Sequence, residues 1–351
     1  MNRINLIRAA VPLILLVVTL GLSQRPYYNW DMFPYMALAL SDPATPFDST
    51  HQQVYKIAKA ELLPKDFEAI SSRQPMLMKD ASAFKDILKY FELKPGYNLI
   101  VSGFCRLGVN PFISTYLPSL ISYFLLGCLL FWWFQFGSPV LLSAFVTLIV
   151  MSSPLLIDLA RYSSPDMLCA LASIVGFVFI LQGKWQLGMS ALLIAILIRP
   201  DSSILFGCVF VAGLFSGMIR WQFALIVGVA AVGFTYFLFG SLELILEYLP
   251  ETASAGNPWL EGLPSVWHSY TLPLLILSVV GIWMNRLHGK VNFGDPKTQL
   301  LLAATTSIFL RYLLHPFVED RFHLPGYLII LMVFWKALME KAGQRKVTAN
   351  G

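Results

Sequence analysis

The sequence has little charge and lacks the signatures of nucleotide cofactors. Only 13% of its 351 residues are charged, whereas soluble domains carry about 25%. It contains no Walker loop, no glycine-rich dinucleotide fingerprint and no Cys-x-x-Cys spacing. The cysteines lie within or beside apolar stretches, which is typical of buried thiols rather than of disulfides or metal ligands. They are Cys105, Cys128, Cys169 and Cys208.

Apolar residues dominate the composition. They make up 57% of the chain, and the mean hydropathy is +0.66, so the composition indicates a protein that is buried in a bilayer. The net charge of +5 does not indicate a nucleic-acid partner. The basic residues gather at the ends of apolar segments, where membrane orientation explains them.

Runs long enough to cross a membrane, about 17–25 apolar residues, recur along the sequence. They predict an all-α polytopic membrane protein with about ten transmembrane helices. The first helix begins like a signal peptide, but no small-x-small cleavage site follows it, so we expect a retained anchor. The expected spans are 7–23, 112–134, 139–154, 166–183, 186–198, 202–219, 222–241, 269–285, 298–314 and 324–339.

The expected organisation has four parts. They are a first transmembrane helix (1–23), a long extracytoplasmic loop (24–110), a transmembrane bundle (111–340) and a cytoplasmic tail (341–351). The loop is expected to contain short amphipathic helices near 52–60 and 83–91, with a weaker apolar patch at 97–108 lying along the membrane surface.

Basic residues in the short loops indicate the orientation. If the N-terminus is cytoplasmic, these residues fall on the cytoplasmic side, as the positive-inside rule requires. They include Arg3, Arg8, Lys184, Arg220, Arg286, Lys290, Lys297, Lys336, Lys341, Arg345 and Lys346. We therefore expect a multi-pass protein of the plasma (inner) membrane with both termini in the cytoplasm.

This orientation places the polar motifs on the extracytoplasmic side, together with the long loop. The motifs are Trp30-Asp31, the segment 158–166, Arg199-Pro200-Asp201 and the segment 315–323. Such one-sidedness predicts a single site at the outer membrane surface. A transporter would more naturally place polar groups near the midplane, and few charges here lie within the spans.

Each motif has a functional and a structural interpretation. Asp31 follows an aromatic cluster at interfacial depth, and partial desolvation there would suit a general base. Arg199 and Arg321 could bind a phosphate at headgroup level. However, Asp201 is equally explained as a helix cap, and Asp158 and Arg161 could simply pair along one helix face.

The segment 315–323 could bind a diphosphate, a metal or a sugar, or could be a solvated loop with internal ion pairs. His315 and His323 are eight residues apart across a proline, which is not a spacing of metal ligands. We therefore expect no metal site, although a divalent cofactor stays an open alternative.

Together these residues resemble the GT-C type of membrane glycosyltransferase, which uses polyprenyl-phosphate-linked sugars. The closest likeness is to uncharacterised bacterial members of that family. The resemblance rests on short motifs: Asn29-Trp30-Asp31-Met32-Phe33-Pro34-Tyr35, Lys94-Pro95-Gly96-Tyr97, Ser164-Pro165-Asp166, Arg199-Pro200-Asp201 and Glu319-Asp320-Arg321-Phe322. Many members carry a pair of acids in the first loop, whereas Asp31 stands alone here.

The resemblance implies an inverting transfer of a sugar from a polyprenyl-phosphate donor to a glycan, lipid or protein acceptor. Asp31 inherits the role of catalytic base, and Arg199, Arg321 and Arg161 are expected to bind the donor phosphate. The expected substrate-binding residues are Trp30, Tyr28, Asp166, Asp201 and His323. A transporter or flippase of lipid-linked sugars and a non-catalytic membrane scaffold are the alternatives.

Overall fold

The computed structural model describes residues 3–219, 296–314 and 320–349, with isolated positions between 222 and 280. In this part of the chain every regular element is a helix, apart from a single isolated bridge between Tyr27 and Tyr162. The expected all-α class is therefore confirmed for the described residues. The spans expected at 222–241 and 269–285 lie almost wholly outside them.

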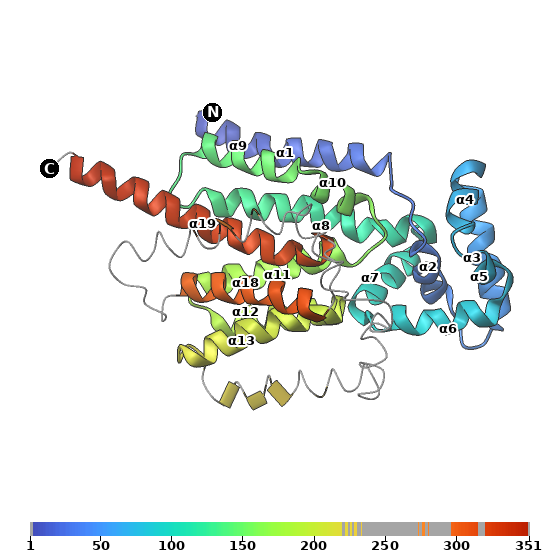
Figure 1. Ribbon diagram of the computed structural model, residues 1–351. Coiled ribbons are helices and arrows are strands. Elements are labelled where there is room, and N and C mark those ends of the chain that lie inside the picture. Colours follow the sequence, from blue (N-terminus) through green and yellow to red (C-terminus); the bar gives the residue numbers. More distant parts are fainter. Residues whose placement is uncertain are drawn as a thin grey trace.

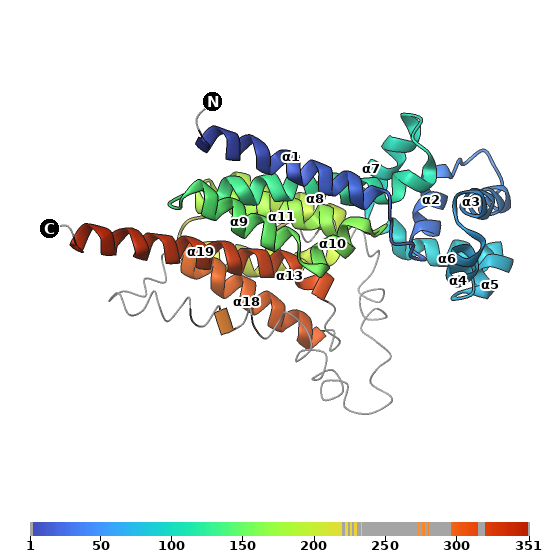
Figure 2. The same cartoon turned by 90° about the horizontal axis from the view of Figure 1, so that it is seen from above.

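The described helices form an elongated bundle with a helical cap at one end (Figure 1). The bundle contains α1 (Arg3–Ser23), α8 (Pro111–Phe134), α9 (Val140–Met151), α10 (Pro154–Arg161), α11 (Asp166–Leu181), α12 (Trp185–Ile198), α13 (Ser203–Phe215), α18 (Pro296–Leu314) and α19 (Asp320–Ala349). The cap contains α2 (Met32–Leu40), α3 (Phe47–Glu61), α4 (Pro64–Ser71), α5 (Pro75–Lys79), α6 (Ala81–Glu92) and α7 (Pro95–Arg106). The start of α1 and the end of α19 lie at the opposite end from the cap (Figures 1 and 2).

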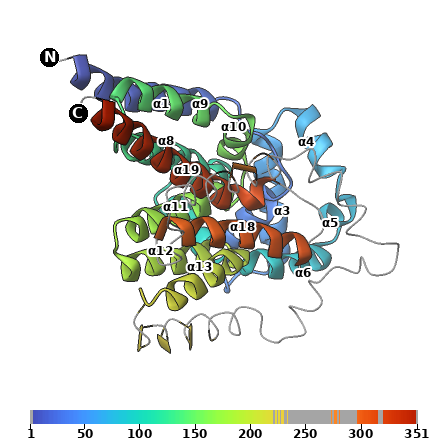
Figure 3. The same cartoon turned by 60° about the vertical axis from the view of Figure 1, so that its left-hand side comes forward.

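Several helices have the composition of membrane spans. α1, α8 and the segment Asp320–Glu340 of α19 are each long and apolar enough to cross a bilayer. The apolar helices α11, α12 and α13 are shorter (Figure 3). α11 packs against α18 and α19, α13 packs against α18, and α12 packs between α11 and α13. The chain therefore has the character of a membrane protein, although the described helices that meet the criterion for a full span are fewer than the ten expected.

The span expected at 139–154 contains a break. It comprises α9 and the start of α10, and the two helices meet at a bend of 62°. The bend lies at Ser152 and Ser153, directly before Pro154, which lacks a backbone N–H and so begins a new helix. Asp158 and Arg161 consequently lie in a helix rather than in a loop. Their side chains pair at 3.7 Å, as the structural interpretation predicted.

The segments expected at 341–351 and 97–108 are both largely helical. α19 continues through the expected tail to Ala349, beyond its apolar segment, which ends at Glu340. The apolar patch expected at 97–108 is the helix α7, which packs against α2, α8 and α12 and leaves Leu99 and Leu107 exposed.

The cap has its own apolar core, and α8 extends into it. Phe33, Val54 and Phe84 of the cap pack with Phe112 and Tyr116, which lie in the first turns of α8. The segments 52–60 and 83–91, expected to form amphipathic helices, lie within α3 and α6, which bury Val54 and Phe84 respectively. α8 therefore connects the polar cap rigidly to the bundle.

The helices α11 and α12 approach one another closely because both carry glycine at the contact. A methyl group added at Gly188 would lie 2.7 Å from the carbonyl oxygen of Gly176 and 2.4 Å from a side-chain carbon of Ile180. Small residues allow such backbone contact in apolar helix pairs. This pair matters for the site because both helices supply residues to it.

We predict that Gly188→Ala destabilises the protein by about 1–3 kcal/mol, because the added methyl forces the two backbones apart. Gly207→Ala on α13 is the matched control, since nothing lies within 4 Å of the added carbon. The control should be neutral or stabilising by up to about 1 kcal/mol, because alanine favours helix. Thermal unfolding in detergent measures both variants, and equal melting temperatures would contradict the predicted packing.

Candidate functional site

The polar motifs were expected on one side of the membrane. Their described residues lie together at the end of the bundle that faces the cap. The C-terminal end of α12, the short 3-10 helix η1 (Pro200–Ser202), the start of α11, the end of α18 and the start of α19 all meet there. The segment between α10 and α11 is held to the chain before α2 by the Tyr27–Tyr162 bridge and by a hydrogen bond from Asn29 to the Ser163 carbonyl at 3.4 Å.

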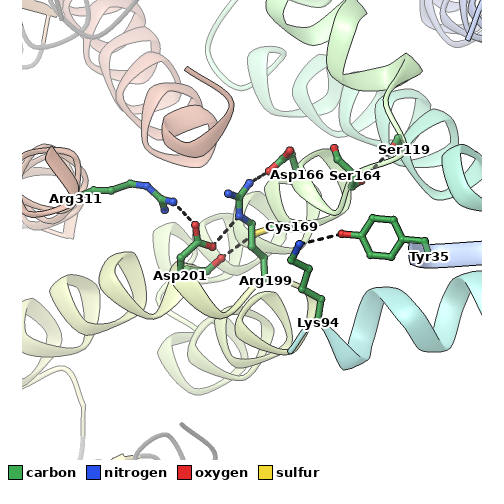
Figure 4. A network of polar contacts seen from close by, with 10 residues as sticks. Tyr35, Lys94, Ser119, Ser164, Asp166, Cys169, Arg199, Asp201 and Arg311 are labelled. Atoms are coloured by element: carbon green, nitrogen blue, oxygen red, sulfur yellow. Dashed lines mark hydrogen bonds and ion pairs between the residues drawn. The ribbon is translucent and has the colours of Figure 1, made fainter. Parts of the chain in front are cut away.

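Arg199 forms ion pairs with two carboxylates (Figure 4). Its Nε donates to Asp201 at 2.7 Å, and its Nη1 pairs with Asp166. Asp201 also accepts from Arg311 of α18. The side chains of Arg199, Asp166 and Arg311 are only 13%, 2% and 14% exposed, so these ion pairs are largely removed from solvent. They bind four helix ends to one another.

The ring of Phe322 lies against three guanidinium groups. The guanidinium carbons of Arg199, Arg311 and Arg321 are 4.2, 4.5 and 4.7 Å from the ring centroid. The negative face of an aromatic ring attracts cations at such distances. Phe322 therefore lies at the centre of the cation cluster, which we define as Arg199, Arg311 and Arg321.

A small pocket that is partly open to solvent lies beside the cation cluster. Among the described residues, its lining includes all three arginines and two carboxylates, Asp166 and Asp201, so the described lining carries one positive charge in excess. His323, only 4% exposed, also lines it. A buried pocket wall with excess positive charge and many N–H donors is suited to binding an anion such as a phosphate group.

Asp31 and Lys94 lie on the cap side of this pocket. Asp31 is half-buried directly before α2, and its carbonyl accepts from the backbone N–H of Tyr35, one helical turn later. Lys94 donates to the hydroxyl of Tyr35 at 3.1 Å, and its ammonium lies 4.6 Å from the ring centroid of Phe91.

Charged groups of both the cap and the bundle act on Lys94. Burial lowers the pKa of its ammonium to about 8, the carboxylate of Asp31 opposes this shift, and the guanidinium groups of Arg199 and Arg321 add to it. Burial, followed by the charge of Asp31, raises the pKa of Tyr35 well above its ordinary value, so its hydroxyl stays protonated. Asp31, Arg199 and Arg321 therefore all lie within electrostatic range of the Lys94 amine.

Gly96 explains how Lys94 comes to lie beside Arg199. A methyl group at Gly96 would lie 3.0–3.1 Å from backbone atoms of Leu197 and Ile198, so glycine allows the start of α7 to abut the end of α12. Pro95 begins α7, and the hydroxyl of Tyr97 donates to the carbonyl of Thr115 on α8. Figure 4 shows Lys94 next to Arg199, with its amine directed towards Tyr35.

The structure brings five of the nine predicted site residues into one pocket wall. They are Arg199, Arg321, Asp166, Asp201 and His323. The predicted base, Asp31, lies near them on the side of Lys94.

The other three predicted residues have different neighbours. Arg161 pairs with Asp158 and donates to the carbonyl of Arg25. Trp30 packs edge-on against two phenylalanine rings of α6, and Tyr28 packs against Phe112 at the start of α8. None of the three is among the residues that line the pocket.

The motifs of the sequence contain Lys94 and Phe322, but neither was given a role, and Arg311 was not singled out. Arg311 could have been found, because an ionisable residue inside an expected apolar span (298–314) is itself a sign of a functional site. The residues His315 and Glu319 of the predicted polar segment lie outside the described residues. Over the described residues, no group of three His, Cys, Asp or Glu side chains could hold a metal ion.

Comparison with known proteins gives no match: no family model, no curated protein and no solved structure matches this chain.

We predict that Lys94 reacts with an amine-acylating reagent at a half-maximal rate near pH 8, because only the neutral amine is nucleophilic. Asp31→Asn should move this midpoint to lower pH, since it removes a charge that favours the ammonium. Mass spectrometry of labelled peptides measures the rate at each pH.

Labelling of the exposed amine of Lys89 is measured in the same samples, as a control for the activity of the reagent and the completeness of the digestion. An unchanged midpoint for Lys94 in the Asp31→Asn variant would show that the two charges do not interact.

Proposed function

We propose that the chain is an integral-membrane glycosyltransferase that moves a sugar from a polyprenyl-phosphate donor to an extracytoplasmic acceptor. The observation that carries the proposal is the pocket with excess positive charge at one end of an apolar bundle, beneath a polar helical cap. A phosphate attached to a membrane lipid would reach this place with its chain still in the bilayer. The resemblance of the polar motifs to GT-C transferases supports the same reaction.

The proposed donor phosphate binds at Arg311 and Arg321. Arg199 lines the same pocket, but its Nε and Nη1 already pair with carboxylates, so its role is mainly to position Asp166, Asp201 and Arg311. Arg161 is left out of the proposed donor site because it contacts Asp158 and Arg25 instead.

Asp31 is the proposed base. Its carboxylate takes the proton of the acceptor hydroxyl, whose oxygen forms a bond to the anomeric carbon of the sugar. The bond between that carbon and the phosphate oxygen breaks, and the electron pair leaves with the polyprenyl phosphate. The arginines stabilise the charge that develops on the phosphate. A single displacement inverts the anomeric centre.

The proposed orientation places the cap and the pocket outside the cytoplasm and both termini inside it. This follows from the basic residues of the short loops. It agrees with the positions of the start of α1 and the end of α19 at the end of the bundle away from the cap.

Mass spectrometry of co-purified lipids tests the donor class. We expect a polyprenyl phosphate, with or without a sugar, in the wild-type protein and its loss in Arg321→Ala. Arg8→Ala removes the same charge from the opposite end of the bundle, where Arg8 contacts Gln135, and should retain the lipid. Only bulk phospholipid in all three samples would contradict the proposed donor.

Asp31→Asn tests the base separately from the donor. We expect the variant to retain the co-purified lipid but to lose sugar transfer by roughly 10²–10⁴-fold, the usual contribution of a general base. Asp48→Asn, on the exposed face of α3, is the matched control and should transfer normally. The readout is the envelope glycan profile of cells that depend on each variant. Normal transfer by Asp31→Asn would show that the base assignment is wrong, and loss in both would point to folding.

A further inference from the structure

Phe322 contacts all three guanidinium groups that line the pocket, although they come from different elements. Arg199 lies at the end of α12, Arg311 near the end of α18, and Arg321 with Phe322 itself in the first turn of α19. No other aromatic ring among the described residues contacts more than one arginine in this way.

Holding three like charges together requires compensation. The described carboxylates of the pocket wall, Asp166 and Asp201, pair with Arg199 and Arg311, and the wall keeps a positive excess. A third carboxylate would neutralise the wall and weaken its attraction for an anion. An aromatic ring attracts guanidinium groups without adding a negative charge, so it can gather the arginines while the pocket keeps its positive excess.

The fold places Phe322 where it can do this. The start of α19 lies against α18 because Gly326 allows close contact, with an added methyl 3.2 Å from the side chain of Ile308. The hydroxyl of Tyr327 donates to Asp320 at 2.9 Å, which fixes the first turns of α19. Phe322 itself is half-buried and lines the pocket.

We propose that Phe322 is a positioning residue that contacts Arg199, Arg311 and Arg321 and so holds Arg311 and Arg321 in place as one binding site for a phosphate group. This inference rests on the proposed function, because it concerns the same pocket. The ring acts through the arginines and does not contact the reacting atoms. The phosphate can belong to a lipid or be free in solution, and the two sources share the same chemistry.

The test measures binding of dodecyl phosphate and of inorganic phosphate to the purified full-length protein in nanodiscs. We expect Phe322→Leu to raise the Kd for dodecyl phosphate on the order of tenfold, and Phe322→Tyr to stay within about twofold of the wild type, because tyrosine keeps the aromatic face. Phe210→Leu makes the same change in a ring that stacks on Phe206 in α13, and it should leave binding unchanged. A lipid-phosphate site binds dodecyl phosphate more tightly, whereas a site for free phosphate binds both alike.

Fluorinated phenylalanines at position 322 separate positioning from simple packing. Each added fluorine weakens the negative face of the ring while nearly preserving its shape, so the Kd should rise stepwise with fluorination. A ring that only fills space would show no such trend, and a flat series would overturn the proposal. The series also decides the question if Phe322→Leu fails to fold.

The outcomes distinguish the two proposals. If the wild-type protein binds neither phosphate, the donor site of the proposed function fails together with this inference. If the wild type binds dodecyl phosphate but the Phe322 variants bind it equally well, only the positioning role of Phe322 fails.

Discussion

The ion pairs of Arg199 with Asp166 and Asp201 hold together the helix ends that form the pocket. Asp166 begins α11, Arg199 ends α12, Asp201 lies in the turn before α13, and Arg311 extends this chain of ion pairs to α18. Breaking a buried pair by removing one partner leaves a charge without compensation and is costly, about 3–5 kcal/mol. The ends of these helices are consequently fixed relative to one another, and the pocket between them has a defined shape.

The same constraint supports the proposed binding of an anion. Since two carboxylates hold Arg199 and Arg311 in place, their positions do not depend on a ligand, and the preorganised cations do not have to move when negative charge develops. The cap supplies the complementary part of the site. Gly96 brings Lys94 against the end of α12, and Tyr35 connects Lys94 to the turn that carries Asp31. A proposed base and a proposed anion site therefore face each other across the junction of cap and bundle.

The sequence predicted the all-α class and the gathering of the polar motifs at one end of the bundle. The long apolar segments and the spacing of the polar motifs between them are properties of the sequence, so both could be recognised without coordinates. The bend between α9 and α10 was missed because the apolar pattern continues through Ser152 and Ser153 and only Pro154 marks the break.

Which residues contact one another at the site was harder to predict from the sequence. Arg199 and Asp201 are neighbours in the sequence, but their pairing with Asp166 and Arg311 depends on how α11, α12 and α18 pack. Phe322 was noted only as the last residue of the motif Glu319-Asp320-Arg321-Phe322, because contact with three arginines has no signature in a single sequence. Tyr28 and Trp30 were predicted from their proximity to Asp31 along the chain, yet their rings turn into the core of the cap.

The most direct measurement is an electron cryo-microscopy map of the protein in nanodiscs that contain polyprenyl phosphate. The account predicts phosphate density between Arg311 and Arg321, with the prenyl chain running along the bundle and Asp31 facing the site from the cap. A lipid phosphate bound elsewhere, with the pocket beside Phe322 occupied by nothing but solvent, would contradict it.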